Sequence, residues 1–62
     1  MIKAAQSLHD KVLWILANNG GKMERSRLRR CMGLTYADLD AILGELAREG
    51  RIRISGEMII LI

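Results

Sequence analysis

Apolar residues recur at steps of three and four in the second half of the chain, and this spacing predicts an amphipathic helix. The residues that share its buried face are Leu39, Ile42, Leu43 and Leu46. Thr35 suits the position before the first turn, because its hydroxyl can accept a hydrogen bond from a free backbone amide there. Gly50 suits the end of the helix, because glycine takes a left-handed conformation without steric cost. We therefore predict a helix over residues 35–49.

Two earlier stretches show the same spacing and predict helices over residues 7–18 and 25–32. The apolar face of the first helix consists of Leu8, Val12, Ile15 and Leu16. The apolar side of the second helix consists of Leu28, Cys31 and Met32. A tight turn follows the second helix, and Leu34 in this turn is expected to fill the core. We expect Cys31 to be a small core residue, and Trp14 to pack in the core or against a second copy.

The C-terminal segment carries the period of β-strands. Residues 51–54 alternate charged and apolar side chains, which predicts a strand with Ile52 and Ile54 facing inward. A two-residue turn at Ser55-Gly56 or Gly56-Glu57 would make a short hairpin. The returning strand does not alternate, because all five of its residues are apolar: Met58, Ile59, Ile60, Leu61 and Ile62. A strand of this kind is either buried on both sides or exposed until a partner covers it.

The composition indicates one small domain with an aliphatic core. The 62 residues are expected to form a single domain over residues 1–62, with residues 1–6 as a lead-in that either frays or extends the first helix. Aromatic residues make up only 3% of the chain, so Leu, Ile, Val and Met must fill the core. One cysteine fits a reducing cytosol, and we find neither a signal peptide nor an apolar run that could span a membrane. We therefore expect a cytoplasmic protein.

The order of these features resembles the winged helix-turn-helix superfamily, in particular small prokaryotic transcriptional regulators. The motifs that carry the resemblance are Gly20-Gly21, the short basic helix, Gly33-Leu34-Thr35 and the run of residues 39–52. The resemblance covers residues 7–62 and implies an α+β fold: a three-helix bundle with a helix-turn-helix and a C-terminal β-hairpin wing. It also implies a brief strand over residues 22–24 that pairs with the wing. In this superfamily the second helix of the motif enters the major groove, so the resemblance implies duplex DNA binding and transcriptional regulation.

Basic and polar residues at three places are the candidate nucleic-acid contacts, and a net charge of +3 permits an anionic partner. Four guanidiniums, which form either a phosphate-gripping patch or a solvated charged face, fall within six residues: Arg25, Arg27, Arg29 and Arg30. Arg51 and Arg53, on one side of the first hairpin strand, either contact phosphate or protect a strand edge. The resemblance puts three residues at the ends of the third helix nearer the bases: Thr35, Tyr36 and Arg48.

The outer face of the third helix supports a rival function. At about 100° per residue, the positions opposite its buried face are Ala37, Ala41, Gly44 and Arg48. Acidic residues flank this stripe, namely Asp38, Asp40 and Glu45. Because carboxylates repel phosphate, the alternative is a protein-interaction or homodimerisation module that uses the small residues or the apolar C-terminal strand. RNA binding is a weaker idea, since Tyr36 is the one aromatic residue expected to be available for stacking.

No set of residues suggests catalysis or a cofactor. The single histidine, His9, and the single cysteine, Cys31, fall in different helices, so no nucleophile and base are paired. Histidine and cysteine do not occur at the spacing of metal ligands, and no glycine is followed by the Lys-Ser or Lys-Thr of a phosphate loop. We therefore predict a protein that is not an enzyme and holds no cofactor or metal, with His9 as a surface or capping residue.

Overall fold

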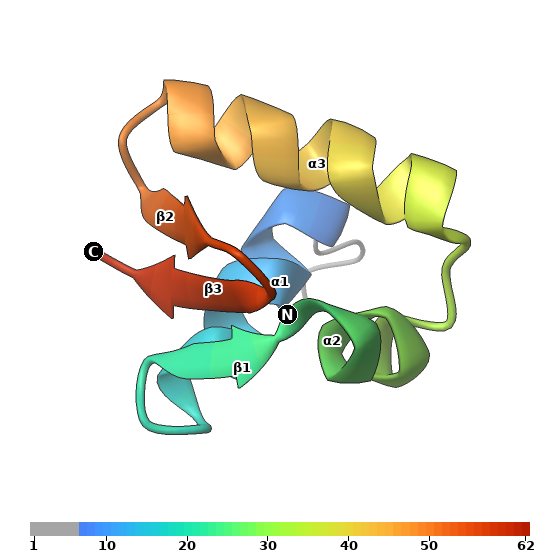
Figure 1. Cartoon of the computed structure of the whole chain (residues 1–62), viewed down its shortest axis with the longest axis horizontal. Coiled ribbons are helices and arrows are strands. Elements are labelled where there is room, and N and C mark those ends of the chain that lie inside the picture. Colours follow the sequence, from blue (N-terminus) through green and yellow to red (C-terminus); the bar gives the residue numbers. More distant parts are fainter. Residues whose placement is uncertain (1–6) are drawn as a thin grey trace, which may run out of the picture.

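The computed structural model describes residues 7–62, in which three helices pack with a three-stranded antiparallel sheet (Figure 1). Residues 1–6, the predicted lead-in, lie outside the described residues. The helices are α1 (Leu8–Ala17), α2 (Arg25–Met32) and α3 (Tyr36–Arg48), and the strands are β1 (Lys22–Glu24), β2 (Ile52–Ser55) and β3 (Met58–Leu61). The predicted α+β class is confirmed. No helix in the described part of the chain is long and apolar enough to cross a membrane.

Local hydrogen bonds explain where α1 and α3 begin and where α3 ends. The Thr35 hydroxyl accepts a hydrogen bond from the Asp38 backbone N–H at 3.1 Å, and the Ser7 hydroxyl accepts one from Asp10 in the same way. Gly50 follows α3 in the left-handed region, with φ +77°. The N–H groups of Gly50 and the next residue donate to carbonyls of the last helical turn, both at 3.0 Å. The predicted start and end of α3 are therefore confirmed.

The apolar C-terminal run forms the central strand of the sheet, whose order is β1-β3-β2. Ile59 and Leu61 face the helices, whereas Ile60 faces outward, in register with Lys22 of β1 and Arg53 of β2. Both edges of β3 are paired within the sheet. This strand therefore cannot pair edge to edge with a strand of a partner, and the short strand implied over residues 22–24 occupies one of its sides.

The core lies between the inner face of the sheet and the three helices, and it is aliphatic as predicted. Among the described residues no polar or charged side chain is buried. The most deeply buried side chains are Val12, Leu16, Leu28, Leu39, Leu43, Leu46, Ile52 and Ile59. Burying one such side chain stabilises the fold by about 1.5 to 3 kcal/mol. Leu34 is half-buried and packs against this core, as predicted.

Cys31 and Trp14 are exposed, so the predicted core position of Cys31 is wrong, and so is the core alternative for Trp14. Packing of Trp14 against a second copy stays a prediction. The α2 helix buries Leu28 and Met32, and Cys31 lies about 60° around the helix from Leu28, on the side away from Met32. Trp14 has 60% of its surface exposed, because it lies about 160° around α1 from the buried Val12. Both residues belong to the outer surface of their helices.

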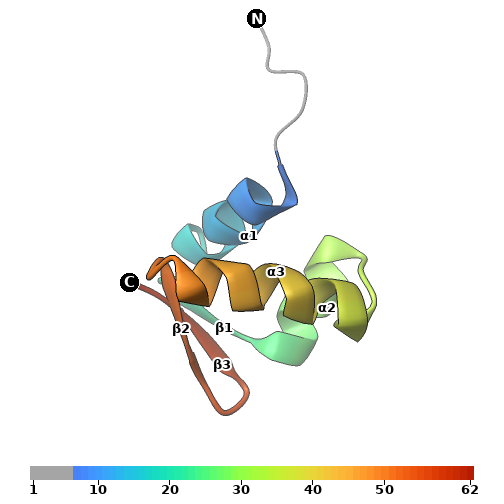
Figure 2. The same cartoon turned by 90° about the horizontal axis from the view of Figure 1, so that it is seen from above.

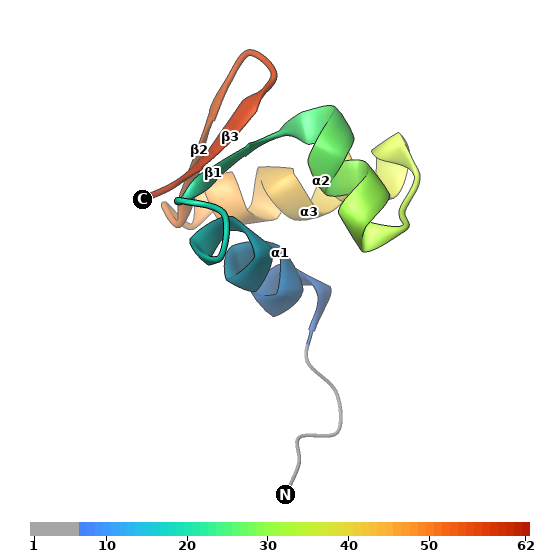
Figure 3. The same cartoon turned by 90° about the horizontal axis from the view of Figure 1, so that it is seen from below.

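Leu8 and Ile54 are also more exposed than predicted, at 46% and 45%. Leu8 is the first residue of α1, outside the buried stretch between Val12 and Leu16. Ile54 has the inward orientation that strand alternation predicts. The end of the β2–β3 hairpin, however, projects beyond the helices, as Figures 2 and 3 show. The described helices leave the Ile54 side chain partly uncovered there.

Candidate nucleic-acid interface

The outer face of α3 is uncovered. Ala37, Ala41, Gly44 and Arg48 are all exposed and lie opposite the buried stripe of the helix, as their spacing predicts. Figure 2 looks down on α3 and shows no other element across it. A Cβ atom added at Gly44 would meet no neighbouring atom within 4 Å. This face therefore offers a smooth surface of small side chains with one cation at its end.

Two of the three acidic side chains beside this face are tied to neighbouring helices. Asp40 accepts two hydrogen bonds from Arg25 of α2, and Glu45 contacts His9 of α1. The hydrogen bonds from Arg25 lower the pKa of the Asp40 carboxyl below its ordinary value of 3.8. Asp38 takes part in the helix cap through its backbone N–H. Of these carboxylates, Asp40 is thus paired with a positive charge within the molecule.

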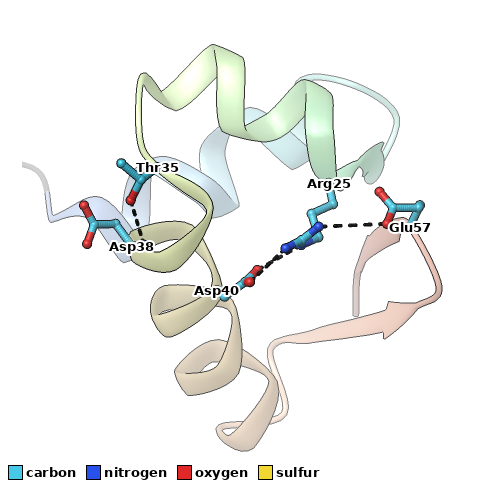
Figure 4. A network of polar contacts seen from close by, with 5 residues as sticks. All are labelled: Arg25, Thr35, Asp38, Asp40 and Glu57. Atoms are coloured by element: carbon cyan, nitrogen blue, oxygen red, sulfur yellow. Dashed lines mark hydrogen bonds and ion pairs between the residues drawn. The ribbon is translucent and has the colours of Figure 1, made fainter.

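Arg25 lies between α3 and the hairpin turn (Figure 4). Its Nε and Nη2 atoms donate to the two carboxylate oxygens of Asp40 at 2.9 and 2.8 Å. Its Nη1 atom is 3.9 Å from a carboxylate oxygen of Glu57, and its backbone N–H donates to the Glu57 carbonyl at 2.7 Å. Its guanidinium carbon is 4.4 Å from the centre of the Tyr36 ring. The hydrogen bonds to Asp40 raise the pKa of Arg25, so the guanidinium stays charged.

Arg29 is also engaged inside the molecule. Its Nη1 atom donates to the Leu34 carbonyl at 3.2 Å, and its guanidinium carbon lies 4.9 Å from the centre of the Tyr36 ring. Its Nε atom is buried and has no hydrogen-bond partner among the described residues. Tyr36, the first residue of α3, therefore contacts two guanidiniums of α2, those of Arg25 and Arg29. Even so, 41% of its surface remains exposed.

The four arginines of α2 do not form the single patch that their closeness in sequence suggests. Arg25 and Arg29 face α3, as their contacts with Asp40 and Tyr36 show. Arg27 and Arg30 are exposed and have no salt bridge within the described residues. Arg27 lies about 160° around α2 from Arg29, because two residues correspond to about 200° of helix rotation. The helix thus presents two cations to its neighbours and two to solvent.

The remaining candidate cations follow one another from the end of α3 into β2. Arg48, Arg51 and Arg53 are all exposed. Arg51 lies 3.8 Å from Glu49, in an exposed ion pair of little energetic weight. Arg53 faces the outer side of the sheet, in register with Ile60. Thr35 is accounted for by the helix cap, in which its hydroxyl is the acceptor.

Sequence reasoning missed the contacts that join these elements. Arg25 and Asp40 are 15 residues apart, and His9 and Glu45 are 36 residues apart. No periodicity or motif links residues at such distances, because each pair meets only after the helices have packed. The sequence predicts only a turn position for Glu57, and nothing in it pairs this residue with the start of α2.

Comparison with known proteins yields no match: no protein-family model, no curated protein and no solved structure is similar to this chain. Function is therefore inferred from the arrangement and chemistry of the residues themselves.

Proposed function

We propose that this chain binds double-stranded DNA as a winged helix-turn-helix domain and acts in transcriptional regulation. The observation that carries the proposal is the uncovered outer face of α3 beside a projecting β2–β3 hairpin, with free arginines on the surrounding elements. In this proposal α2 and α3 are the two helices of the motif, α3 enters the major groove and the hairpin is the wing.

The dimensions and surface of α3 suit a groove. Its 13 residues span about 20 Å, and the major groove of B-DNA, about 12 Å wide, admits one α-helix. The small side chains at Ala37, Ala41 and Gly44 let the helix backbone come close to the base edges. Because Asp40 is paired with Arg25, its negative charge faces the phosphates less than the sequence alone suggests.

The structure changes the set of residues proposed to contact DNA. Phosphate contacts are assigned to exposed arginines, which are Arg27, Arg30, Arg48, Arg51 and Arg53. Tyr36 remains a candidate for a contact near the bases, because its ring is partly exposed at the start of α3. Arg25 and Arg29 are left out, because their guanidiniums are already engaged inside the molecule. Thr35 is left out because it caps α3.

Titration of a mixed-sequence duplex with the protein, followed by fluorescence anisotropy at several salt concentrations, tests the proposal. We expect a Kd of about 10⁻⁴ to 10⁻⁶ M at physiological salt, with a linear decrease of log K against log salt. Replacing Arg53 by Gln should lower the magnitude of that slope by about 0.9, because one phosphate contact is lost. Lys11→Gln removes the same charge from α1 and should leave the slope unchanged. Absence of binding at low salt, or binding that does not depend on salt, overturns the proposal.

A protein-interaction module is the second candidate, and the same uncovered small-residue face favours it. Two helices pack closely where small residues line the contact, and Gly44 has open space above it. Sedimentation over a range of protein concentrations tests whether two copies associate through this face. If they do, Ala41→Glu should return the protein to a monomer. A single monomeric species at every concentration contradicts self-association.

A further inference from the structure

The Arg25 side chain joins three elements that the proposed function uses together. It touches α3 through Asp40 and Tyr36, it touches the hairpin turn through Glu57, and it stands at the first position of α2. Building on the proposed DNA binding, we infer that Arg25 is a positioning residue that fixes the hairpin tip relative to α3, and that it makes no phosphate contact itself.

The charge around Arg25 argues against a phosphate contact. Its guanidinium carries one positive charge and faces two carboxylates, those of Asp40 and Glu57, so the three side chains together carry one negative charge. Its Nε and Nη2 atoms donate to Asp40, its Nη1 atom lies 3.9 Å from Glu57, and its guanidinium carbon lies over the Tyr36 ring. A phosphate would have to displace a two-pronged carboxylate and would meet net repulsion.

The hairpin tip depends on this residue for its contact with the helices. Ile52, at the base of the hairpin, and Ile59, which pairs with Ile54 nearer the turn, are buried, whereas residues 53–57 are all exposed. Among the described residues, each polar contact between the tip and a helix runs through Arg25, by its backbone N–H and its side chain. If the Arg25 side chain is removed, only the backbone hydrogen bond from Arg25 to Glu57 joins the tip to a helix, and the link from the tip to Asp40 of α3 is lost. We therefore expect the tip to move relative to α3.

Asp40→Asn is the sharpest test, because the two roles of Arg25 predict opposite results. If Arg25 positions the hairpin, the variant should bind duplex DNA about fivefold more weakly, with an unchanged salt slope, and Arg25→Gln should behave alike. If Arg25 is a phosphate contact restrained by Asp40, Asn should release it and give tighter binding with a steeper slope. Asp38→Asn removes a charge from the other flank of α3 and, as the matched control, should not weaken binding. Tighter binding by Asp40→Asn, or a slope reduced by about 0.9 in Arg25→Gln, overturns the inference.

A measurement without DNA separates this inference from the proposed function. In ¹⁵N relaxation, the backbone order parameters of residues 54–57 should fall from about 0.85 toward about 0.6 in both Asp40→Asn and Arg25→Gln. Ile52 and Ile59 should stay rigid in both variants, because the core still holds them. Unchanged order at the tip refutes the positioning role. A loosened tip in a protein that binds no duplex refutes the proposed function and leaves the hairpin contact intact as a structural finding.

Discussion

Replacing glycine by alanine is expected to change stability in opposite directions at two positions, one inside α3 and one just after its end. Gly44 lies inside α3 with helical backbone, and Gly50 follows the helix with φ +77°. At both positions an added Cβ would meet nothing within 4 Å, so steric contact does not distinguish them. Alanine in a helix interior is more favourable than glycine by about 0.8 to 1 kcal/mol. In the left-handed region, alanine costs about 1 to 2 kcal/mol.

The size of the protein makes these differences easy to measure. At about 2.1 cal/mol/K per residue, the entropy of unfolding for 62 residues is about 0.13 kcal/mol/K. A change of 1 kcal/mol therefore moves Tm by about 8 °C. We expect Gly44→Ala to raise Tm by about 6 to 8 °C and Gly50→Ala to lower it by about 8 °C or more, since the backbone strain there is at least about 1 kcal/mol.

Thermal unfolding followed by far-ultraviolet circular dichroism checks both values, and urea unfolding of the same variants gives the free energies independently. The two shifts must have opposite signs if backbone conformation alone decides the outcome. A lower Tm for Gly44→Ala would show that its surface is covered or that α3 is distorted there. A higher Tm for Gly50→Ala would show that the residue does not hold the left-handed end of α3.

Three further outcomes follow from burial and charge. Leu43→Ala should lower the free energy of unfolding by about 2 to 5 kcal/mol because the side chain is buried, whereas Leu8→Ala, at an exposed position, should cost less than half of that in urea unfolding. The pKa of Asp40 is lower in the folded protein than its ordinary value of 3.8. Its pairing with Arg25 therefore stabilises the fold fully above pH 3.8, and this stabilisation is lost as the pH falls through the pKa of Asp40 in the folded protein. The difference in unfolding free energy between the wild type and Asp40→Asn should therefore shrink in acid, and a constant difference would contradict the pairing. Cys31 should react with a thiol reagent in the native protein without denaturant, since it is exposed; protection until unfolding would restore the predicted core position.

The candidate site could be predicted from the sequence only in part. The outer stripe of α3 follows from helical period, and its exposure is confirmed at Ala37, Ala41 and Gly44. The division of the α2 arginines into inner and outer pairs could not be predicted, because it depends on where α3 lies against α2. The pairing of Asp40 could not be predicted either. From the sequence its carboxylate is expected to repel phosphate, whereas in the structure it pairs with the Arg25 guanidinium.

The sequence by itself determined the three helices, the hairpin and their order, whereas the strand β1 followed only from the family resemblance. The Thr35 cap, the end of α3 at Gly50 and the two-residue turn of the hairpin depend on interactions within a few residues, so composition and spacing are enough to predict them. Only the tertiary structure decided which strand edges and helix faces are covered and which charged side chains form pairs. It placed β3 between two strands, left Ile54 and Cys31 exposed and brought Arg25 to Asp40, because these outcomes depend on how elements distant in sequence pack together.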